Sequence, residues 1–240
     1  MTSIESMILA QTRRFPGESA QYRAARNKLL ASEIELRRLL EEVAALRRRL
    51  PSGGALAQDY VFDEGAFDLD DLSTVRKVKF SQLFDRPDAS LVVYSFMYGP
   101  KMSQACASCS SILDSLNGAA PHASQRINLV VVAKSPIEHI RSHARERGWR
   151  NLRLLSSATN SYNRDYYGED DTGAQLPALN VFTRQADRIR HCYCTELLFA
   201  PPDKGQDARH VDLIWPLWNL FDFTAEGRGT SWRPKLRYGP

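Results

Sequence analysis

Residues 91–109 read LVVYSFMYGPKMSQACASC, and this stretch carries most of the information about the architecture. Its first part, residues 91–97, is a continuous apolar run rich in β-branched and aromatic residues, which predicts a buried strand. Gly99 and Pro100 end that strand. Residues 106–117 have a spacing compatible with a helix, so two cysteines are expected where a helix begins.

The sequence beyond this stretch continues to alternate between strands and helices. Further strands are predicted at residues 127–133, 179–183 and 189–194. Helices are predicted over residues 135–147, where Ser135 and Pro136 provide a cap and a first turn, and over residues 211–220. This order predicts an α/β domain over residues 56–225, built on a central mixed β-sheet flanked by helices.

A long helix is predicted before this domain, over residues 18–50, which contain no Gly or Pro and are rich in Ala, Leu, Glu and Arg. Apolar residues recur along it every seven positions, with companions between them, which is typical of a coiled-coil-like apolar seam. The members of this apolar seam are Leu29, Leu36, Leu39, Val43, Leu46 and Leu50, with Ser32 as a polar interruption. We expect residues 1–55 to form a helical extension that packs on the main domain or a second subunit, with another protein as the alternative.

Two segments are predicted to lack regular structure. Residues 51–74 are rich in Gly and Asp and are expected to form a solvated connection, because their acidic residues lack the ligand spacing of an EF-hand loop. Residues 226–240 are expected to form a basic C-terminal tail.

The composition of the 240-residue chain excludes several classes of protein. With 43% hydrophobic and 25% charged residues, the chain matches neither a disordered protein nor a disulfide-rich scaffold. Its longest apolar stretch is far shorter than the roughly 20 residues that cross a bilayer, and its N-terminus lacks a secretory pattern. A cytoplasmic protein without membrane partners is therefore expected. The net charge of +4 lies in Arg-rich helix segments and the tail, so nucleic acid is not an expected partner.

Cys106 and Cys109 are the sharpest functional signal in the sequence. The unpaired N–H groups and the dipole at a helix N-terminus stabilise a thiolate and lower a cysteine pKa from about 8.5 to about 3.5–7.5. Cys106 is therefore the expected nucleophile. Cys109, one helical turn further along, is expected to resolve a mixed disulfide, so that the pair cycles between dithiol and disulfide.

From about residue 25 to residue 229 the chain resembles a family of bacterial thioredoxin-like proteins, domain of unknown function 899, which are relatives of thioredoxins and peroxiredoxins. The matching positions are residues 47–51, 60–62, 94–100, 106–110 and 162–166, together with Asp114, Gly118 and His122. The resemblance implies a thioredoxin-like fold. The chain departs from the family pattern at Ser95, where His is expected, and at Cys192 and Cys194, which the pattern lacks.

The resemblance and the residue types together suggest further site residues. Pro177 lies two residues before the predicted strand at residues 179–183, and in thioredoxin-like folds such a proline is cis and faces the cysteine pair. An ordinary trans proline at a strand edge is the alternative. Aromatic and polar residues are expected to line a substrate pocket around the cysteines, although core packing is the commoner fate of a tyrosine. The predicted substrate-binding residues are Pro177, Tyr94, Tyr98, His122, Tyr162 and Arg164.

Two other groups have spacings that recur in metal sites. Cys192 and Cys194 would complete a four-cysteine zinc site with the first pair, but their one-residue spacing favours buried, small hydrophobic roles. His139 and His143 lie four apart on a predicted helix, but no Glu follows His139, which favours a solvated face. No metal ion and no cofactor is therefore predicted.

These features together favour an enzyme, a thioredoxin-like thiol-disulfide oxidoreductase with a dedicated protein or small-molecule substrate. One alternative is a peroxiredoxin-like peroxidase or a specialised small-molecule pathway enzyme on the same fold. Another is a non-catalytic scaffold or binding protein that dimerises through the apolar seam. A homodimer through the N-terminal helix is expected in either case.

Overall fold

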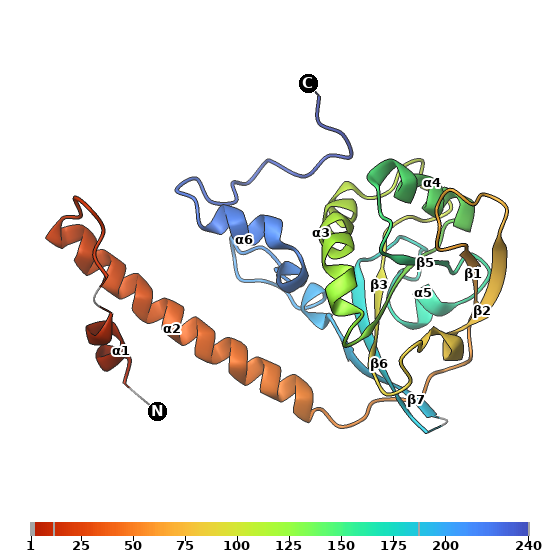
Figure 1. The fold of residues 1–240 in the computed structure, drawn as a ribbon, viewed down its shortest axis with the longest axis horizontal. Helices are drawn as coiled ribbons and strands as arrows, with labels where there is room; N and C mark the ends of the chain where they lie inside the picture. The colour runs from red at the N-terminus through yellow and green to blue at the C-terminus, as the bar shows by residue number, and fades with distance from the viewer. Residues whose placement is uncertain (1–2, 12, 187, 240) are drawn as a thin grey trace. The chain divides into compact units, whose positions relative to one another are not determined.

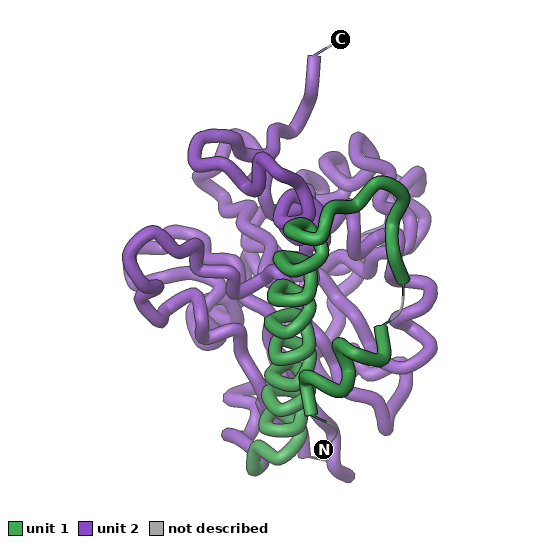
Figure 2. The backbone as a smooth tube through the Cα atoms, turned by 90° about the vertical axis from the view of Figure 1, so that its left-hand side faces the viewer, with its two compact units in different colours: residues 1–51 green, residues 52–240 purple. Residues whose placement is uncertain are grey.

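The computed structural model of the chain describes residues 3–11, 13–186 and 188–239. It divides into two compact units, residues 1–51 and residues 52–240 (Figure 2). The first unit is helical, whereas the second contains the β-sheet and all four cysteines.

The N-terminal unit consists of helix α1 (Ile4–Ala10) and helix α2 (Ala20–Arg49). Ser3 and Ser19 cap these helices, since each hydroxyl accepts a hydrogen bond at 3.1 Å from a backbone N–H three residues further on. The long predicted helix is confirmed, and α1 is an element that the sequence reasoning did not anticipate. None of the helices in the described part of the chain is long and apolar enough to cross a bilayer.

The second unit is built on a seven-stranded sheet with the order β2-β1-β5-β4-β3-β6-β7 (Figure 1). Its strands are β1 (Val61–Gly65), β2 (Val75–Lys79), β3 (Leu91–Ser95), β4 (Asn128–Ala133), β5 (Arg153–Ser156), β6 (Ala178–Gln185) and β7 (Arg188–Cys194). Strands β3, β4 and β5 are parallel, and the flanking strands pair antiparallel on both sides. The predicted thioredoxin-like α/β architecture, with a mixed sheet and a long N-terminal helix, is confirmed.

Helices connect the parallel strands and cover the sheet. They are α3 (Ala107–Ala123), α4 (Ile137–Arg147), α5 (Tyr162–Asp165) and α6 (Pro216–Asp222), with 3₁₀ turns at Phe80–Leu83, Glu196–Leu198 and Asp212–Ile214. Helix α3 connects β3 to β4 and α4 connects β4 to β5, which is the crossover that parallel strands require.

Successive residues of the central strands face two separate cores. Tyr94 and Val131 pack in one core with residues of α3 and α4, together with Trp149. Val93 and Val130 face the opposite, aromatic-rich core. The cysteine-bearing helix therefore lies over one face of the sheet only.

Three details differ from the sequence-based expectations. Residues 51–74 contain strand β1, which the charged residues Asp63 and Glu64 concealed. Strands β2 and β5 were not predicted, because three of the five residues of β2 are Lys or Arg and β5 has only four residues. The hydroxyl of Ser135 does not cap α4 but donates to the carbonyl of Gly99 at 3.1 Å, and the following proline occupies the cap position instead.

Candidate functional site: a cysteine pair at a helix start

The cysteine pair lies where the chain enters helix α3. Cys106 is the N-cap residue, and Ala107 is the first helical residue. The backbone N–H of Cys106 donates to the carbonyl of Met97 at 3.1 Å, which ties this loop to the end of β3. The backbone N–H of Cys109 donates to the Cys106 sulfur at 3.3 Å. The sulfur thus takes the place of the side-chain oxygen that normally accepts from the first turn of a helix.

These contacts favour the thiolate form of Cys106. The Cys109 thiol, followed by the backbone N–H groups of Cys109 and Ser108, lowers the pKa of Cys106 from 9.0 to about 6, against the opposing effect of burial. The first turn of α3, all of which is described, contains no acidic residue that would oppose the negative charge. Cys106 remains partly exposed. A low pKa and access from solvent are the two properties of a reactive cysteine.

Cys109 has the opposite environment. Its side chain is only 1% exposed. The hydrogen bond to the Cys106 sulfur, burial and the negative charge on Cys106 raise the pKa of Cys109 well above 9.0. The hydroxyl of Tyr94 lies beside this thiol and acts in the other direction, lowering its pKa. Within the described chain that hydroxyl is fully buried and has no partner at hydrogen-bonding geometry. The pair therefore combines one thiolate with one protonated, protected thiol.

A histidine from α4 contacts the start of α3. The Ser110 hydroxyl donates to the carbonyl of Cys106 at 2.9 Å and is 2.9 Å from Nε2 of His143. Because a hydroxyl has one proton, we assign His143 Nε2 as the donor to Ser110. The imidazole ring packs against Tyr98 and Trp149, with centroid separations of 6.1 and 5.2 Å. Burial lowers the pKa of His143, so the ring is neutral at neutral pH.

The solvated face predicted for His139 and His143 is therefore incorrect for His143. Sequence reasoning missed this residue, and also Ser110, as neighbours of the cysteine pair. The spacing in the sequence could have indicated it. His143 lies three residues after the apolar Ile140, and residues three apart share one face of a helix, which here is the buried face.

Two pockets flank Cys106. The larger has a volume of about 1170 Å³ and is lined by the residues on either side of Cys106, by Tyr98 and His143, and by residues 234–237. The smaller has a volume of about 160 Å³, and Ser108 forms part of its lining. Tyr98 is thus the predicted tyrosine that faces a pocket at the cysteines.

Pro177 lies at the same end of the sheet as the cysteine pair. In the β3–β6 register Ala178 pairs with Ser95, so Pro177 comes one residue beyond, where β3 leads into the loop toward Cys106. The structure has no cis peptide bond among its described residues, so the bond preceding Pro177 is trans. This corrects the cis geometry that the resemblance implied, while a role of Pro177 in substrate binding stays a prediction.

Three other predicted substrate-binding residues do not meet at the cysteines, and Tyr94 reaches Cys109 only from the buried side. Tyr94 and Tyr162 are fully buried in the two different cores, so neither lines a pocket. His122 is exposed in the last turn of α3, roughly 22 Å from the cysteine end at about 1.5 Å per residue. Arg164 is exposed on α5, the helix whose Tyr162 packs in the core opposite α3.

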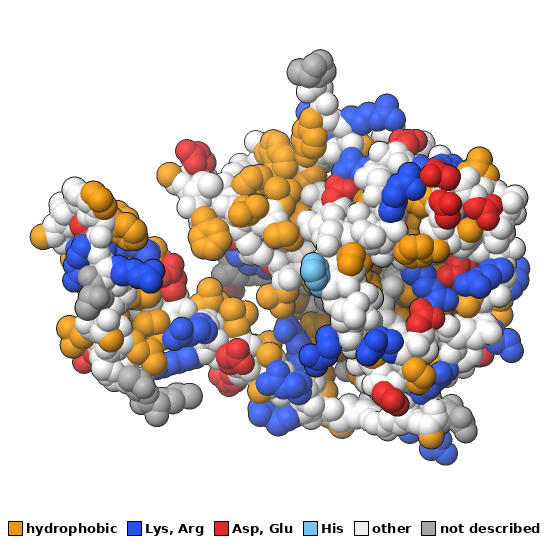
Figure 3. All heavy atoms as spheres, viewed as in Figure 1, with side chains coloured by type: hydrophobic (Ala, Val, Ile, Leu, Met, Phe, Trp, Pro, Cys, Tyr) orange, Lys and Arg blue, Asp and Glu red, His pale blue; other side chains and the backbone are white. Residues whose placement is uncertain are grey.

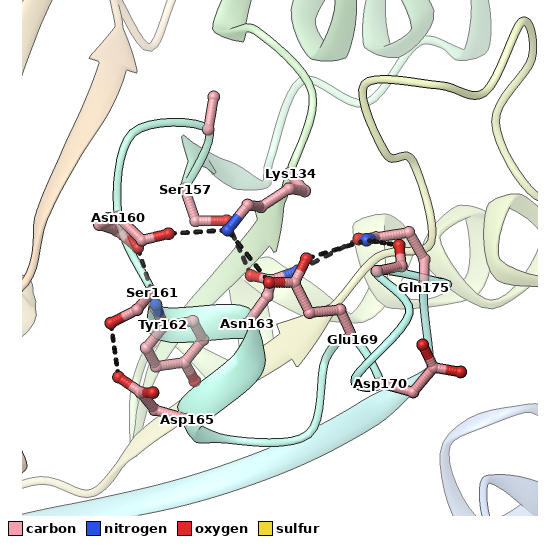
Figure 4. A network of polar contacts seen from close by, with 12 residues as sticks. Lys134, Ser157, Asn160, Ser161, Tyr162, Asn163, Asp165, Glu169, Asp170 and Gln175 are labelled. Carbon is pink, nitrogen blue, oxygen red and sulfur yellow. Dashed lines mark hydrogen bonds and ion pairs between the residues drawn. The ribbon is translucent and has the colours of Figure 1, made fainter.

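Residues 162–166, which match the family pattern, take part in a polar network (Figure 4). The amide oxygen of Asn163 accepts from the Ser157 hydroxyl at 2.7 Å. Lys134 forms an ion pair with Glu169 at 3.2 Å, and the two side chains are only 16% and 12% exposed. Figure 4 shows both pointing toward Asn163. These contacts hold together the loops that follow β4 and β5.

The second pair of cysteines lies on β7. Burial raises the pKa of Cys194 to about 11, and the Cys192 sulfur is 3.1 Å from the Thr183 hydroxyl. In the described part of the chain, no three His, Cys, Asp or Glu side chains come together as metal ligands would. The four-cysteine zinc alternative is therefore not supported by the arrangement of these residues.

Comparison with solved structures shows similarity to several peroxiredoxins. Thioredoxin peroxidase I of Plasmodium yoelii is 15% identical, with 70% of this chain and 88% of that chain covered and a TM-score of 0.44. Peroxidoxin BcpB of Mycobacterium tuberculosis is 16% identical, with coverages of 70% and 95% and a TM-score of 0.41. Peroxiredoxin Q of Xanthomonas campestris is 12% identical, with coverages of 69% and 94% and a TM-score of 0.44.

Sequence identities of 12–16% and TM-scores below 0.5 carry no information about the chemistry of this chain. No curated protein matches the sequence. A family model described as "Bacterial protein of unknown function (DUF899)" matches residues 12–238, which is most of the chain. The chain therefore belongs to the DUF899 family of bacterial proteins.

Proposed function

We propose that this protein is a thiol-disulfide oxidoreductase in which Cys106 is the nucleophile and Cys109 is the resolving thiol. The observation that carries the proposal is the hydrogen bond from the Cys109 N–H to the Cys106 sulfur at the start of α3. With a pKa of about 6, most Cys106 is thiolate at neutral pH. A free thiolate of this kind persists in a reducing compartment, so we place the protein in the cytoplasm.

The reaction begins when the Cys106 thiolate attacks one sulfur of a substrate disulfide. A new S–S bond forms to Cys106, the substrate S–S bond breaks, and the other sulfur leaves as a thiolate with the electron pair. The mixed disulfide no longer carries negative charge beside Cys109, which removes one cause of the raised pKa of that thiol. The proton of Cys109 then passes to the departing thiolate.

The second step regenerates the free substrate. The Cys109 thiolate attacks the Cys106 sulfur and expels the remaining substrate sulfur as a thiolate, leaving a Cys106–Cys109 disulfide. Residues three apart at a helix start have Cα atoms about 5–6 Å apart, a separation that a disulfide spans. The substrate has gained two electrons, and the cysteine pair has lost them.

A redox titration tests this proposal directly. The full-length protein is equilibrated in dithiothreitol and glutathione buffers, alkylated and weighed by mass spectrometry. We expect Cys106 and Cys109 to interconvert between dithiol and disulfide at a potential between about −300 and −120 mV, the range of enzymes of this kind. Cys106→Ser should abolish the transition, and Cys192→Ser, a control on β7, should leave it unchanged. A pair that stays in one state across this range contradicts the proposal.

Peroxide separates the peroxidase alternative from this reaction. Hydrogen peroxide oxidises a thiolate to sulfenic acid with release of hydroxide, and condensation of Cys109 with that sulfenic acid yields the disulfide and water. We expect Cys106 to react with peroxide no faster than a free thiol with the same thiolate fraction. A rate far above that reference would identify a peroxidase and overturn the assignment to disulfide substrates.

We also propose that the N-terminal unit associates with that of a second copy through the apolar seam. The side chains of Leu36, Leu39 and Leu46 are 56%, 55% and 51% exposed. Figure 3 shows hydrophobic side chains among Lys and Arg on the visible surface of this unit. Light scattering at micromolar concentration should give twice the monomer mass, and Leu36→Glu should return it to the monomer mass. Leu220→Glu on α6, an equally exposed control, should not. A monomeric wild type contradicts this proposal.

A further inference from the structure

The larger pocket beside Cys106 has one wall made by the C-terminal segment. Residues 234–237 line it together with α4 and the residues that flank Cys106. The Arg147 guanidinium donates to the carbonyl of Leu236 at 2.7 Å, and Arg237 forms an ion pair with Glu146 at 3.2 Å. The segment predicted as a basic tail is thus held against α4 and forms a wall of the pocket that Ala105 and Ala107, the neighbours of Cys106, also line.

Positive charge dominates the lining of this pocket. Its charged side chains are Arg147, Lys235 and Arg237 against Glu146, the one acidic residue among the described lining residues. Arg147 is also paired with Asp114, which does not line the pocket. Lys235 thus leaves an excess of positive charge, and the dipole of α3 adds to it from the cysteine end.

The rest of the lining suits the body of a small molecule. Tyr98 and His143 present ring surfaces with centroids 6.1 Å apart, and Met102 adds an apolar side chain. Ser103 and Gln104 contribute polar groups from the loop before Cys106. A volume of about 1170 Å³ exceeds the roughly 300–1000 Å³ of a typical ligand site and leaves room for a two-armed molecule.

We propose that this pocket binds a small, negatively charged disulfide, with Lys235 and Arg237 recognising its carboxylate groups. This inference rests on the proposed thiol chemistry and adds the class of substrate. Cys106 attacks one sulfur of the bound disulfide, and the other sulfur leaves with the electron pair. Cys109 then attacks the Cys106 sulfur and expels the sulfur bound to it, so that one molecule of disulfide becomes one thiol and one thiolate. A dithiol reductant then returns the cysteine pair to its reduced state.

Two aromatic disulfides of different charge test the inference. The dianionic probe is 5,5′-dithiobis(2-nitrobenzoate), and the neutral probe is 4,4′-dithiodipyridine. Single-turnover rates are measured at neutral pH with the full-length reduced protein carrying Cys192→Ser, which removes a partly exposed thiol outside the site. In the double variant Lys235→Ala/Arg237→Ala we expect the rate with the dianionic probe to fall about 5- to 20-fold and that with the neutral probe to change less than about 2-fold.

Controls separate charge recognition from general effects. Lys77→Ala/Lys204→Ala removes the same net charge from exposed positions outside the pocket and should leave both rates unchanged. High salt should narrow the difference between the two probes in the wild type. Equal losses with both probes, or no loss with either, would overturn the inference while the cysteine chemistry stands. Failure of both probes to oxidise the pair through Cys106 would instead overturn the proposed function.

Discussion

The N–H of Cys109 donates to the sulfur of Cys106 at 3.3 Å, so the resolving residue itself stabilises the nucleophile. The coupling runs in both directions, because the charge on Cys106 keeps the proton on Cys109. Charge on one sulfur thus delays ionisation of the other until the first has reacted. This ordering assigns attack to Cys106 and resolution to Cys109 without a separate base.

The first prediction concerns the ionisation of Cys106. Its rate of alkylation by iodoacetamide should rise with pH to a plateau with a midpoint near pH 6, because its pKa is about 6. Cys109→Ala keeps the backbone donor but removes the thiol donor, the largest contribution, so the midpoint should move upward. Mass spectrometry of the Cys106 peptide measures both curves. An identical midpoint in the two proteins would show that the thiol of Cys109 does not stabilise the thiolate.

The same shift predicts how stability depends on pH. The folded pKa of Cys106 is lowered from 9.0 to about 6, so its contribution to stability is complete above pH 9 and is lost as pH falls toward 6. The shift corresponds to at most about 4 kcal/mol, and partial exposure reduces this to about 1–3 kcal/mol. Cys109, whose pKa is raised, acts oppositely: its contribution is complete below pH 9 and is lost above it.

Urea unfolding of the reduced protein measures this dependence. The free energy of unfolding of wild type relative to Cys106→Ala should increase between pH 6 and pH 9. The contribution of the histidines to the pH dependence cancels in this difference, because both proteins contain the same histidines. A difference that stays constant over this range would contradict the low pKa.

Tyr94 should act on the second step of the reaction. Its buried hydroxyl lowers the pKa of Cys109 and has no other partner in the described structure. Tyr94→Phe should therefore slow conversion of the mixed disulfide to the Cys106–Cys109 disulfide, while attack by Cys106 keeps its rate. Stability should stay equal or rise by about 1 kcal/mol, since an unpartnered buried hydroxyl is removed. Acid quenching and mass spectrometry separate the two steps.

Tyr162→Phe is the matched control for this prediction. Tyr162 is likewise fully buried with an unpartnered hydroxyl in the described structure, but it lies in the opposite core. It should reproduce any gain in stability without slowing resolution. Equal effects of the two variants on resolution would assign the role of Tyr94 to packing alone.

Strands β3, β4, β6 and β7 and the helix start at Cys106 were predictable because they depend on local patterns. Residues 91–97 form an uninterrupted apolar run, and the break at Gly99 and Pro100 precedes the helix directly. Strand β1 was hidden because its two consecutive acidic residues made it resemble a solvated segment. Its Asp63 and Glu64 pair with basic residues of neighbouring strands, and such partners lie far apart in sequence.

The surroundings of the Cys106 thiolate could not be predicted, because they too depend on contacts between residues far apart in the sequence. Tyr94 and Tyr98 are four apart near the end of one strand, yet one is buried beneath α3 and the other lines the pocket. The ring of His143 reaches Ser110 across 33 positions of sequence. The wall formed by residues 234–237 depends on Arg147 holding a backbone carbonyl, which no spacing in the sequence reveals.

The last prediction concerns the polar network that joins the loops after β4 and β5. Glu169→Gln removes the carboxylate that neutralises Lys134 and keeps only the hydrogen bond from Lys134 to the carbonyl of Asn160 at 2.7 Å. The lysine side chain is 16% exposed, so unfolding should cost about 2–4 kcal/mol less. Asp70→Asn breaks an exposed pair with Arg150, at 64% and 61% exposure, and should change stability by no more than about 1 kcal/mol.

Both variants should keep the alkylation midpoint of Cys106, because the network contacts neither cysteine of the pair. Lys134→Met combined with Glu169→Gln should recover part of the loss, since no unpaired charge remains. A loss for Glu169→Gln as small as that of Asp70→Asn would mean that water screens the Lys134–Glu169 pair despite its burial.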